Sequence, residues 1–359
     1  MLMLVCRLGA LRQIRWKLRG SALDRTFLVL FGAPGVPHGD TLNLAFQNLR
    51  PDDLQEVVCS MLETLIRKKV LYPFRLLDRW FTVALDATGC VTFHERHCDH
   101  CLTRKSGSTI LYYHNVLEAK LVARTGLALS LMTEFIENEA PDVSKQDCEL
   151  NAFRRPAPRL KQRFPRLPLC LLMDGLYACG PAFSVCKAMG WKFIVSLKDG
   201  SLPSVHAEFH GLTALHPENN LIRTNPQKNP HQVFRWMADI PYVDTRKLSH
   251  VLHVVECRET KPAEKSELKT TRFVWASNIK PDQKTSRPSP TMEGGCAGKL
   301  KTRASTSRKT GDTGWSTPTA RIKPRPKSFI SCFRSPKRSC NRSIGEAFSP
   351  KLSPRASAA

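Results

Sequence analysis

The sequence predicts an α/β protein in which helices cover a mixed sheet. The apolar segments Leu169 to Met173 and Trp191 to Leu197 have the length of buried strands, and Pro181 to Met189 between them has helical spacing. A strand, a helix and a strand in this order favour a parallel pair of strands covered by helices. A hydrophobic content of 42% over 359 residues is enough to build a core.

Two helices are predicted near the N-terminus. Apolar residues recur at helical spacing from Leu54 to Ile66, after Pro51-Asp52-Asp53, which suits a helix start. An earlier helix is expected to open near Asp40. Residues 1–75 are therefore predicted to form a small helical, DNA-binding domain. Its candidate DNA contacts are the basic residues before the first helix, although these also suit a solvated face: Arg12, Arg15 and Lys17.

Extended structure is expected next. The apolar run Trp80 to Leu85, a turn at Ala87 to Gly89 and the segment Val91 to Phe93 are typical of a β-hairpin. Ile110 to Val122 is a strand candidate, whereas Leu127 to Ile136 has helical spacing and is expected to be a helix.

The C-terminal part divides into two segments of different composition. Residues from His206 to Ile279 are expected to be rich in strands, with Val251 to Glu256 and Arg272 to Ser277 the clearest. After Lys280 no apolar period remains, and Pro, Ser, Thr, Lys and Arg dominate. This composition predicts a folded core over residues 76–280 and a disordered basic tail over residues 281–359.

Charge favours a polyanionic partner. The formal net charge is +24 and the tail contributes 17 Lys and Arg against 4 Asp and Glu. Because neutralised phosphates release counterions, double-stranded DNA is the first expected partner. A membrane surface is the rival, but no run of about 18 apolar residues occurs, so no membrane partner and a cytoplasmic location are expected. The thirteen cysteines are scattered through a sequence in which no secretory signal is recognised. This favours reduced thiols or metal ligands over disulfides.

Two aspartates are candidate catalytic residues. Asp86 and Asp174 each follow an apolar strand and precede a turn that contains glycine. Such strand ends hold the sites of open α/β sheets, and carboxylate oxygens are the ligands that Mg²⁺ or Mn²⁺ prefers. We therefore predict that both residues bind Mg²⁺ or Mn²⁺ for phosphoryl transfer. Aspartate at this position also commonly caps a turn.

A cysteine and histidine cluster and a basic series are further candidates. Cys98 and Cys101 have the Cys-x2-Cys spacing of zinc sites, and His97 or His100 could complete the coordination of Zn²⁺. The alternative is a polar turn with incidental thiols. The basic series directly precedes the Asp174 strand and suits phosphate contacts or a solvated face: Arg154, Arg155, Arg159 and Lys161.

Several segments, in order, resemble the landmarks of insertion-sequence transposases of the DDE type. These segments are PHGDTLN, FTVALDATG, HCDHCLTRKSGS, SKQDCELNAFRR and CLLMDGLYACGPAFSVCKAMGWKFIVSLKDG, within a similarity that spans Gln13 to Ile279. The resemblance implies an RNase H-like core with a β-rich insertion at about residues 203–280. It also implies that Asp86 and Asp174 match the first two catalytic carboxylates.

The third carboxylate of that pattern, a Glu on a helix after the insertion, is missing. The acidic residues after Asp282 are Glu293, Asp312 and Glu346, and none lies on an apolar helical face. However, codons for Gly294 to Pro336 can be chosen so that a shifted frame reads RLRWKIENEGFNVQKNGG and then an apolar helix. This predicts a frameshift after about Lys280, so that the tail is out of frame. Asp147 or Glu149 could substitute for the lost Glu, although both also suit a helix start or a surface pair.

Three functional hypotheses follow. The first is a transposase-like protein for DNA cleavage and strand transfer at insertion-sequence ends, inactive because the catalytic Glu is missing. Its partners would be double-stranded DNA at transposon ends and target, with a homodimer as the expected assembly and a place on the bacterial nucleoid. The second is a non-catalytic DNA-binding protein that inhibits an intact transposase. The third is an unfolded remnant.

Overall fold

The computed structural model describes residues 37–123, 125–224, 231–262 and 268–281, together with five isolated positions between residues 25 and 35. The predicted tail after Pro281 and the basic residues Arg12, Arg15 and Lys17 lie outside the described residues. The helical elements are α4 (Gly39–Asn48), α5 (Pro51–Arg67), η1 (Tyr72–Phe74), α6 (Glu149–Arg154), α7 (Pro156–Arg163), η2 (Gly175–Tyr177), α8 (Gly180–Met189) and α9 (Pro203–Leu215). The strands are β1 (Phe81–Phe93), β2 (Leu102–Ser106), β3 (Thr109–Val122), β4 (Ala128–Ile136), β5 (Leu169–Met173), β6 (Lys192–Leu197), β7 (Asn220–Thr224), β8 (His231–Val243), β9 (Ser249–Pro262) and β10 (Leu268–Ser277).

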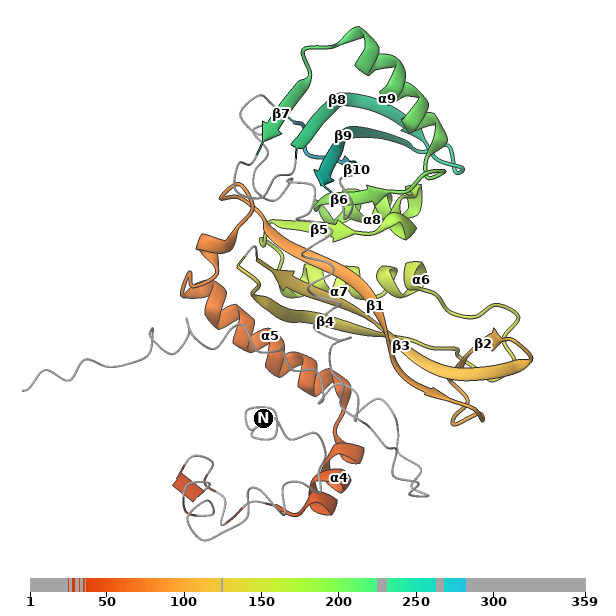
Figure 1. Cartoon of the computed structure of the whole chain (residues 1–359). Helices are drawn as coiled ribbons and strands as arrows, with labels where there is room; N and C mark the ends of the chain where they lie inside the picture. The colour runs from red at the N-terminus through yellow and green to blue at the C-terminus, as the bar shows by residue number, and fades with distance from the viewer. Residues whose placement is uncertain are drawn as a thin grey trace, which may run out of the picture.

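The chain is an α/β protein with a mixed and largely antiparallel sheet. The strand order is β2-β3-β1-β5-β6-β10-β9-β8-β7, and β4 pairs with β3 (Figure 1). β1, β5 and β6 are parallel neighbours, and the pairing of β5 with β6 is the one that the strand-helix-strand pattern predicted. The pairs on either side of these three strands are antiparallel.

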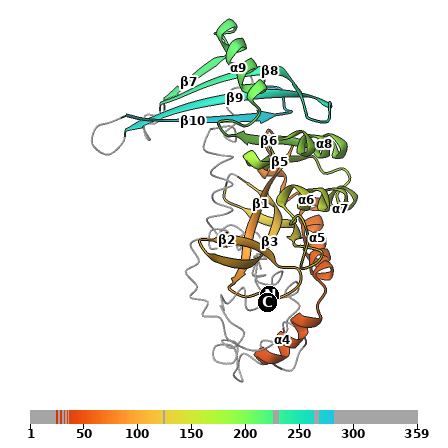
Figure 2. The same cartoon turned by 90° about the vertical axis from the view of Figure 1, so that its right-hand side faces the viewer.

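Helices gather on one face of this sheet. Figure 2 shows α5, α6, α7 and α8 on the same side of β1, β3, β5 and β6. Side chains on a strand alternate between faces, and here Val83 and Leu85 join the larger apolar cluster while Ala84 between them joins the smaller one. The larger cluster also takes in Phe183 of α8 and Phe209 of α9, so the helix-covered face holds the main core.

Helix α5 is joined to the sheet. It begins at Pro51 with acidic residues in its first turn, which suits the positive end of the helix dipole. Cys59 and Leu62 are buried in the main core. The Gln55 side chain donates to Leu131 O at 2.9 Å and accepts from Thr133 N at 2.9 Å. Because these are backbone groups of β4, α5 packs on the same core as the sheet.

Two predicted elements were wrong. The expected hairpin at residues 80–93 is the single strand β1, because residues 87–89 pair with β3 and the chain turns only after Phe93. The expected helix at residues 127–136 is β4, because its backbone pairs with β3 from Val122 to Asn115. The expected strand-rich segment from His206 to Ile279 is confirmed, since it contains β7 to β10, although the helix α9 precedes these strands.

Candidate functional site

Asp86 and Asp174 lie on neighbouring parallel strands. Phe81 of β1 is opposite Leu169 of β5, and each aspartate lies five residues after its member of that pair. Asp174 follows β5 directly, as expected, whereas Asp86 lies inside β1 rather than at its end. Both side chains are half-buried. The parallel register therefore brings the two predicted residues to the same level of the sheet.

A buried tyrosine marks where carboxylates gather. Tyr177 is fully buried, and its hydroxyl donates to Glu149 Oε2 at 3.4 Å. Burial raises the pKa of Tyr177 well above its ordinary value, and the negative charges of Glu149, Asp174 and Asp86 raise it further. The structure thus brings Glu149, at the first position of α6, into the neighbourhood of the two strand aspartates.

Asp174 also performs the turn-capping role. Its Oδ1 accepts from Leu176 N at 3.0 Å at the start of η2. Among the described residues, one group has three or more ligand atoms of His, Cys, Asp or Glu within 4.8 Å of each other. Asp86, Asp174 and Glu149 are not members of it. The carboxylates are neighbours, but they do not form a closed set of three ligands.

That one group consists of Cys98, Cys101 and His114. The two sulfur atoms are 3.7 Å apart, and each lies 3.4 Å from Nε2 of His114. Cys101 and His114 are buried and Cys98 is half-buried. These three side chains could hold a metal ion.

His97 and His100, either of which was expected to complete this site, are not members of the group in the structure. The His97 ring stacks on Phe93, with ring centroids 4.4 Å apart. His100 Nδ1 forms a hydrogen bond with Asn138 O at 2.8 Å. The third member is instead His114 of β3, which lies among the apolar residues of a strand and therefore carries no local metal motif. The signal that could have found it is a histidine within a predicted apolar strand, because histidine is seldom fully buried without a partner. In the structure His114 is indeed only 3% exposed.

Burial affects the protonation of this group. It raises the pKa of Cys98 to about 11 and lowers the pKa of His114 below its ordinary value. Without a metal, the Cys98 thiol is protonated and the His114 ring is neutral at pH 7.

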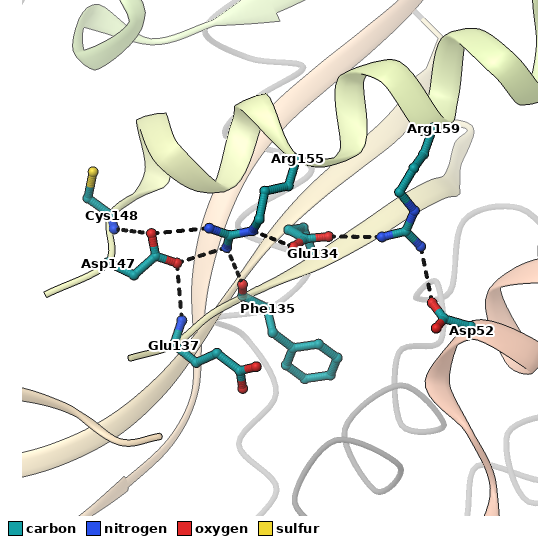
Figure 3. Close-up of polar contacts among 8 residues, drawn as sticks. All are labelled: Asp52, Glu134, Phe135, Glu137, Asp147, Cys148, Arg155 and Arg159. Atoms are coloured by element: carbon teal, nitrogen blue, oxygen red, sulfur yellow. Dashed lines mark hydrogen bonds and ion pairs between the residues drawn. The ribbon is translucent and has the colours of Figure 1, made fainter. Parts of the chain in front are cut away.

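The predicted DNA contacts in the basic series have partners inside the chain. Arg155 donates to Glu134 Oε1 at 2.7 Å, to Asp147 Oδ2 at 2.8 Å and to Phe135 O at 2.7 Å (Figure 3). Arg159 bridges Glu134 at 3.3 Å and Asp52 of α5 at 3.1 Å. These bonds give both arginines a structural role, and contact with DNA stays a prediction for them.

The other two members of the series differ. Lys161 Nζ donates to Pro165 O at 3.0 Å, so it closes the end of α7. Arg154 is exposed.

The chain matches no protein-family model and no curated protein. Within the residues that the structure describes, no helix is both long enough and apolar enough to cross a membrane.

Proposed function

We propose that this chain is a transposase-like protein of the DDE type, with an RNase H-like core that binds double-stranded DNA at insertion-sequence ends. The proposal rests on one observation above all. Asp86 and Asp174, which the resemblance matches to the first two catalytic carboxylates, lie at the same level of the parallel strands β1 and β5. The mixed sheet and its helix-covered face support an RNase H-like core, and a net charge of +24 supports a nucleic-acid partner.

The carboxylates suit a divalent cation. Asp86 and Asp174 would hold Mg²⁺ or Mn²⁺, whose charge stabilises the developing negative charge of a phosphoryl transfer. The site lacks the third carboxylate of the family pattern, since the written frame has no equivalent Glu after residue 280. A site with less negative charge binds the second ion poorly. The expected activity of the chain is therefore DNA binding, with strand transfer largely lost.

The proposal can be tested by restoring the predicted reading frame after residue 280. One protein is produced as written and another with the reading frame restored, so that the helix with the RW-x-IE pattern follows residue 280. DNA containing the inverted repeats that flank the gene is the substrate. We expect both proteins to bind this DNA, and the restored protein alone to nick it when Mn²⁺ is added.

Site variants then assign the chemistry. In the restored protein, Asp86→Asn and Asp174→Asn should abolish nicking and leave DNA affinity within about threefold, because the lost carboxylates are metal ligands rather than DNA contacts. Asp142→Asn is the matched control, since Asp142 is exposed and lies away from the strand aspartates in the sequence. Nicking by the restored protein that survives Asp86→Asn and Asp174→Asn would overturn the proposal.

One observation favours the second candidate, a DNA-binding protein that occupies transposon ends and inhibits the intact enzyme. The carboxylates near Tyr177 do not form a closed set of three metal ligands within the described part of the chain. Mixing the written protein with its frame-restored form would separate the two candidates. Inhibition of nicking at equal concentrations supports the inhibitor, and unchanged nicking contradicts it.

A further inference from the structure

The Cys98, Cys101 and His114 group has the dimensions of a zinc site. Tetrahedral Zn²⁺ with bonds of about 2.3 Å to sulfur and about 2.0 Å to nitrogen places two sulfur ligands about 3.8 Å apart and a sulfur and a nitrogen about 3.5 Å apart. The observed separations are 3.7 Å between the sulfur atoms and 3.4 Å from each sulfur to Nε2. The three atoms are therefore already spaced to bind one ion.

The chemistry of the three atoms selects the metal. Two thiolates and one imidazole suit Zn²⁺, whereas Mg²⁺ and Mn²⁺ require oxygen ligands. A disulfide is the other use of a Cys-x2-Cys pair. However, a disulfide requires the sulfur atoms to be about 2.05 Å apart. The separation of 3.7 Å fits the metal better than the disulfide.

The protein holds the site in place from two sides. On one side, Val91 of β1 is opposite His114 of β3 and Gly89 is opposite Asn115, so Cys90 of β1 is the extra residue of a β-bulge beside the site. A bulge bends a strand and changes where its side chains point. On the other side, the buried Asn138 donates from Nδ2 to Cys101 O at 3.0 Å and from its backbone N to His100 O at 3.2 Å. The loop that carries the two cysteines is thus fixed before any metal binds.

The hydrogen bonds continue towards the carboxylates. Asn138 Oδ1 accepts from Asp147 N at 3.2 Å. Figure 3 shows the next step, in which Asp147 Oδ2 accepts from Glu137 N at 3.3 Å and from Arg155. Asp147 lies two residues before Glu149, whose carboxylate accepts from Tyr177. A loop fastened at the cysteines therefore also restrains the start of α6.

We propose that Cys98, Cys101 and His114 bind one Zn²⁺ that fastens the loop between β1 and β2 to β3. The ion has a structural role, and water fills the fourth position. This inference is independent of the proposed function, because it depends on ligand geometry and not on DNA.

Metal content is the direct test. The full chain is purified with reductant, stripped with a chelator and titrated with Zn²⁺ or with Co²⁺, whose absorption reports thiolate ligands. We expect one ion per chain, with sulfur-to-cobalt charge-transfer bands. Cys98→Ser, Cys101→Ser and His114→Ala should each weaken binding by at least about 100-fold, beyond the cost of losing an outer-shell contact. A wild-type protein that binds neither ion above background would overturn the proposal.

Cys90→Ser is the matched control, because Cys90 lies in β1 beside the site, serine keeps the backbone of the bulge, and the Cys90 thiol donates to Thr88 O at 3.8 Å rather than to the group. We expect it to retain the ion, and a loss as large as that of Cys98→Ser would contradict the assignment. Hydrogen exchange of the wild-type protein with and without Zn²⁺ covers the case in which a variant fails to fold. Zinc should slow exchange first in residues 94–102 and 137–148. Equal exchange with and without bound zinc would contradict the structural role.

Discussion

The two candidate sites both lie beside β1 but are built in different ways. Asp86 and Asp174 belong to the central parallel strands, where the paired backbone and the core below set their level. Cys98 and Cys101 come from a loop, and His114 comes from β3 beside a β-bulge. The first site depends on the register of the central sheet, and the second depends on a local loop and a bound ion.

This difference explains why the two sites should respond differently to perturbation. The carboxylates carry like charges, so only the packed sheet holds them together. The Cys98 thiol and the His114 imidazole are neutral without metal, and a bound Zn²⁺ would add its own binding free energy to the stability of the loop. Changes in the central core should therefore disturb the carboxylates. Changes in the hairpin that β2 and β3 form should instead leave the global fold intact.

The largest expected effect is at the central strand. Leu171 of β5 is fully buried, and Leu171→Ala should lower the free energy of unfolding by about 2–5 kcal/mol, because it leaves a cavity in the core. Ile110→Ala in β3, where the side chain is 47% exposed, is the hairpin control and should cost less than about 1 kcal/mol. Urea denaturation of the three proteins measures both. Equal losses for the two variants would show that the two regions do not differ in this way.

The next effect tests the connection between the sites. Arg155→Ala removes the donor shared by Glu134 and Asp147, which are 14% and 11% exposed, and should cost about 1–3 kcal/mol because two largely buried carboxylates lose a partner. Arg155→Lys keeps the charge but loses the two-pronged geometry, so an intermediate loss is expected. Thermal denaturation gives the order of the three proteins. A stable Arg155→Ala protein would mean that Asp147 is held without this arginine.

The central fold followed from patterns that are local in the sequence. The strands at residues 169–173 and 192–197, the helix between them and α5 were predicted correctly, because their apolar spacing matches the face that each element buries. The residues of β4 have spacing that suits a helix equally well. They form a strand because their backbone pairs with β3, and this pairing cannot be seen in the local sequence pattern.

The sites followed the same rule. Cys98 and Cys101 were found because their spacing is local, whereas His114 required the pairing of β1 with β3 and the bulge at Cys90. His97 and His100 were chosen because they are adjacent in sequence, but stacking on Phe93 and a bond to Asn138 occupy them instead. The charge of Arg155 and Arg159 was visible, but their carboxylate partners come from β4, α5 and the segment before α6.

A smaller effect tests the surroundings of the carboxylates. Tyr177→Phe removes the hydroxyl that donates to Glu149 and should cost about 0.5–1.5 kcal/mol at pH 7. Burial and the nearby carboxylates raise the pKa of Tyr177, so the folded state holds this proton more tightly than the unfolded state does. The resulting stability is fully present below the unfolded pKa of about 10 and is lost as pH rises above it.

Wild-type protein should therefore lose stability above about pH 10 faster than Tyr177→Phe does, and the difference between them should shrink or reverse. Urea denaturation at neutral and alkaline pH measures this difference. A difference that stays constant with pH would mean that Tyr177 is not held in its neutral form by burial and the carboxylates.

The smallest expected effect concerns Arg159. Its side chain is 47% exposed, Asp52 is 70% exposed, and Glu134 keeps Arg155 as a partner, so Arg159→Ala should change the free energy of unfolding by less than about 1 kcal/mol. This near-neutrality makes Arg159 a better probe of DNA contact than Arg155, whose loss disturbs the fold. If Arg159 reaches a phosphate, Arg159→Ala weakens DNA binding and lowers the slope of log affinity against log salt by about one. A residue that neutralises no phosphate releases no counterion. If the slope of log affinity against log salt is unchanged in Arg159→Ala, Arg159 therefore serves only to bridge Glu134 and Asp52 within the fold.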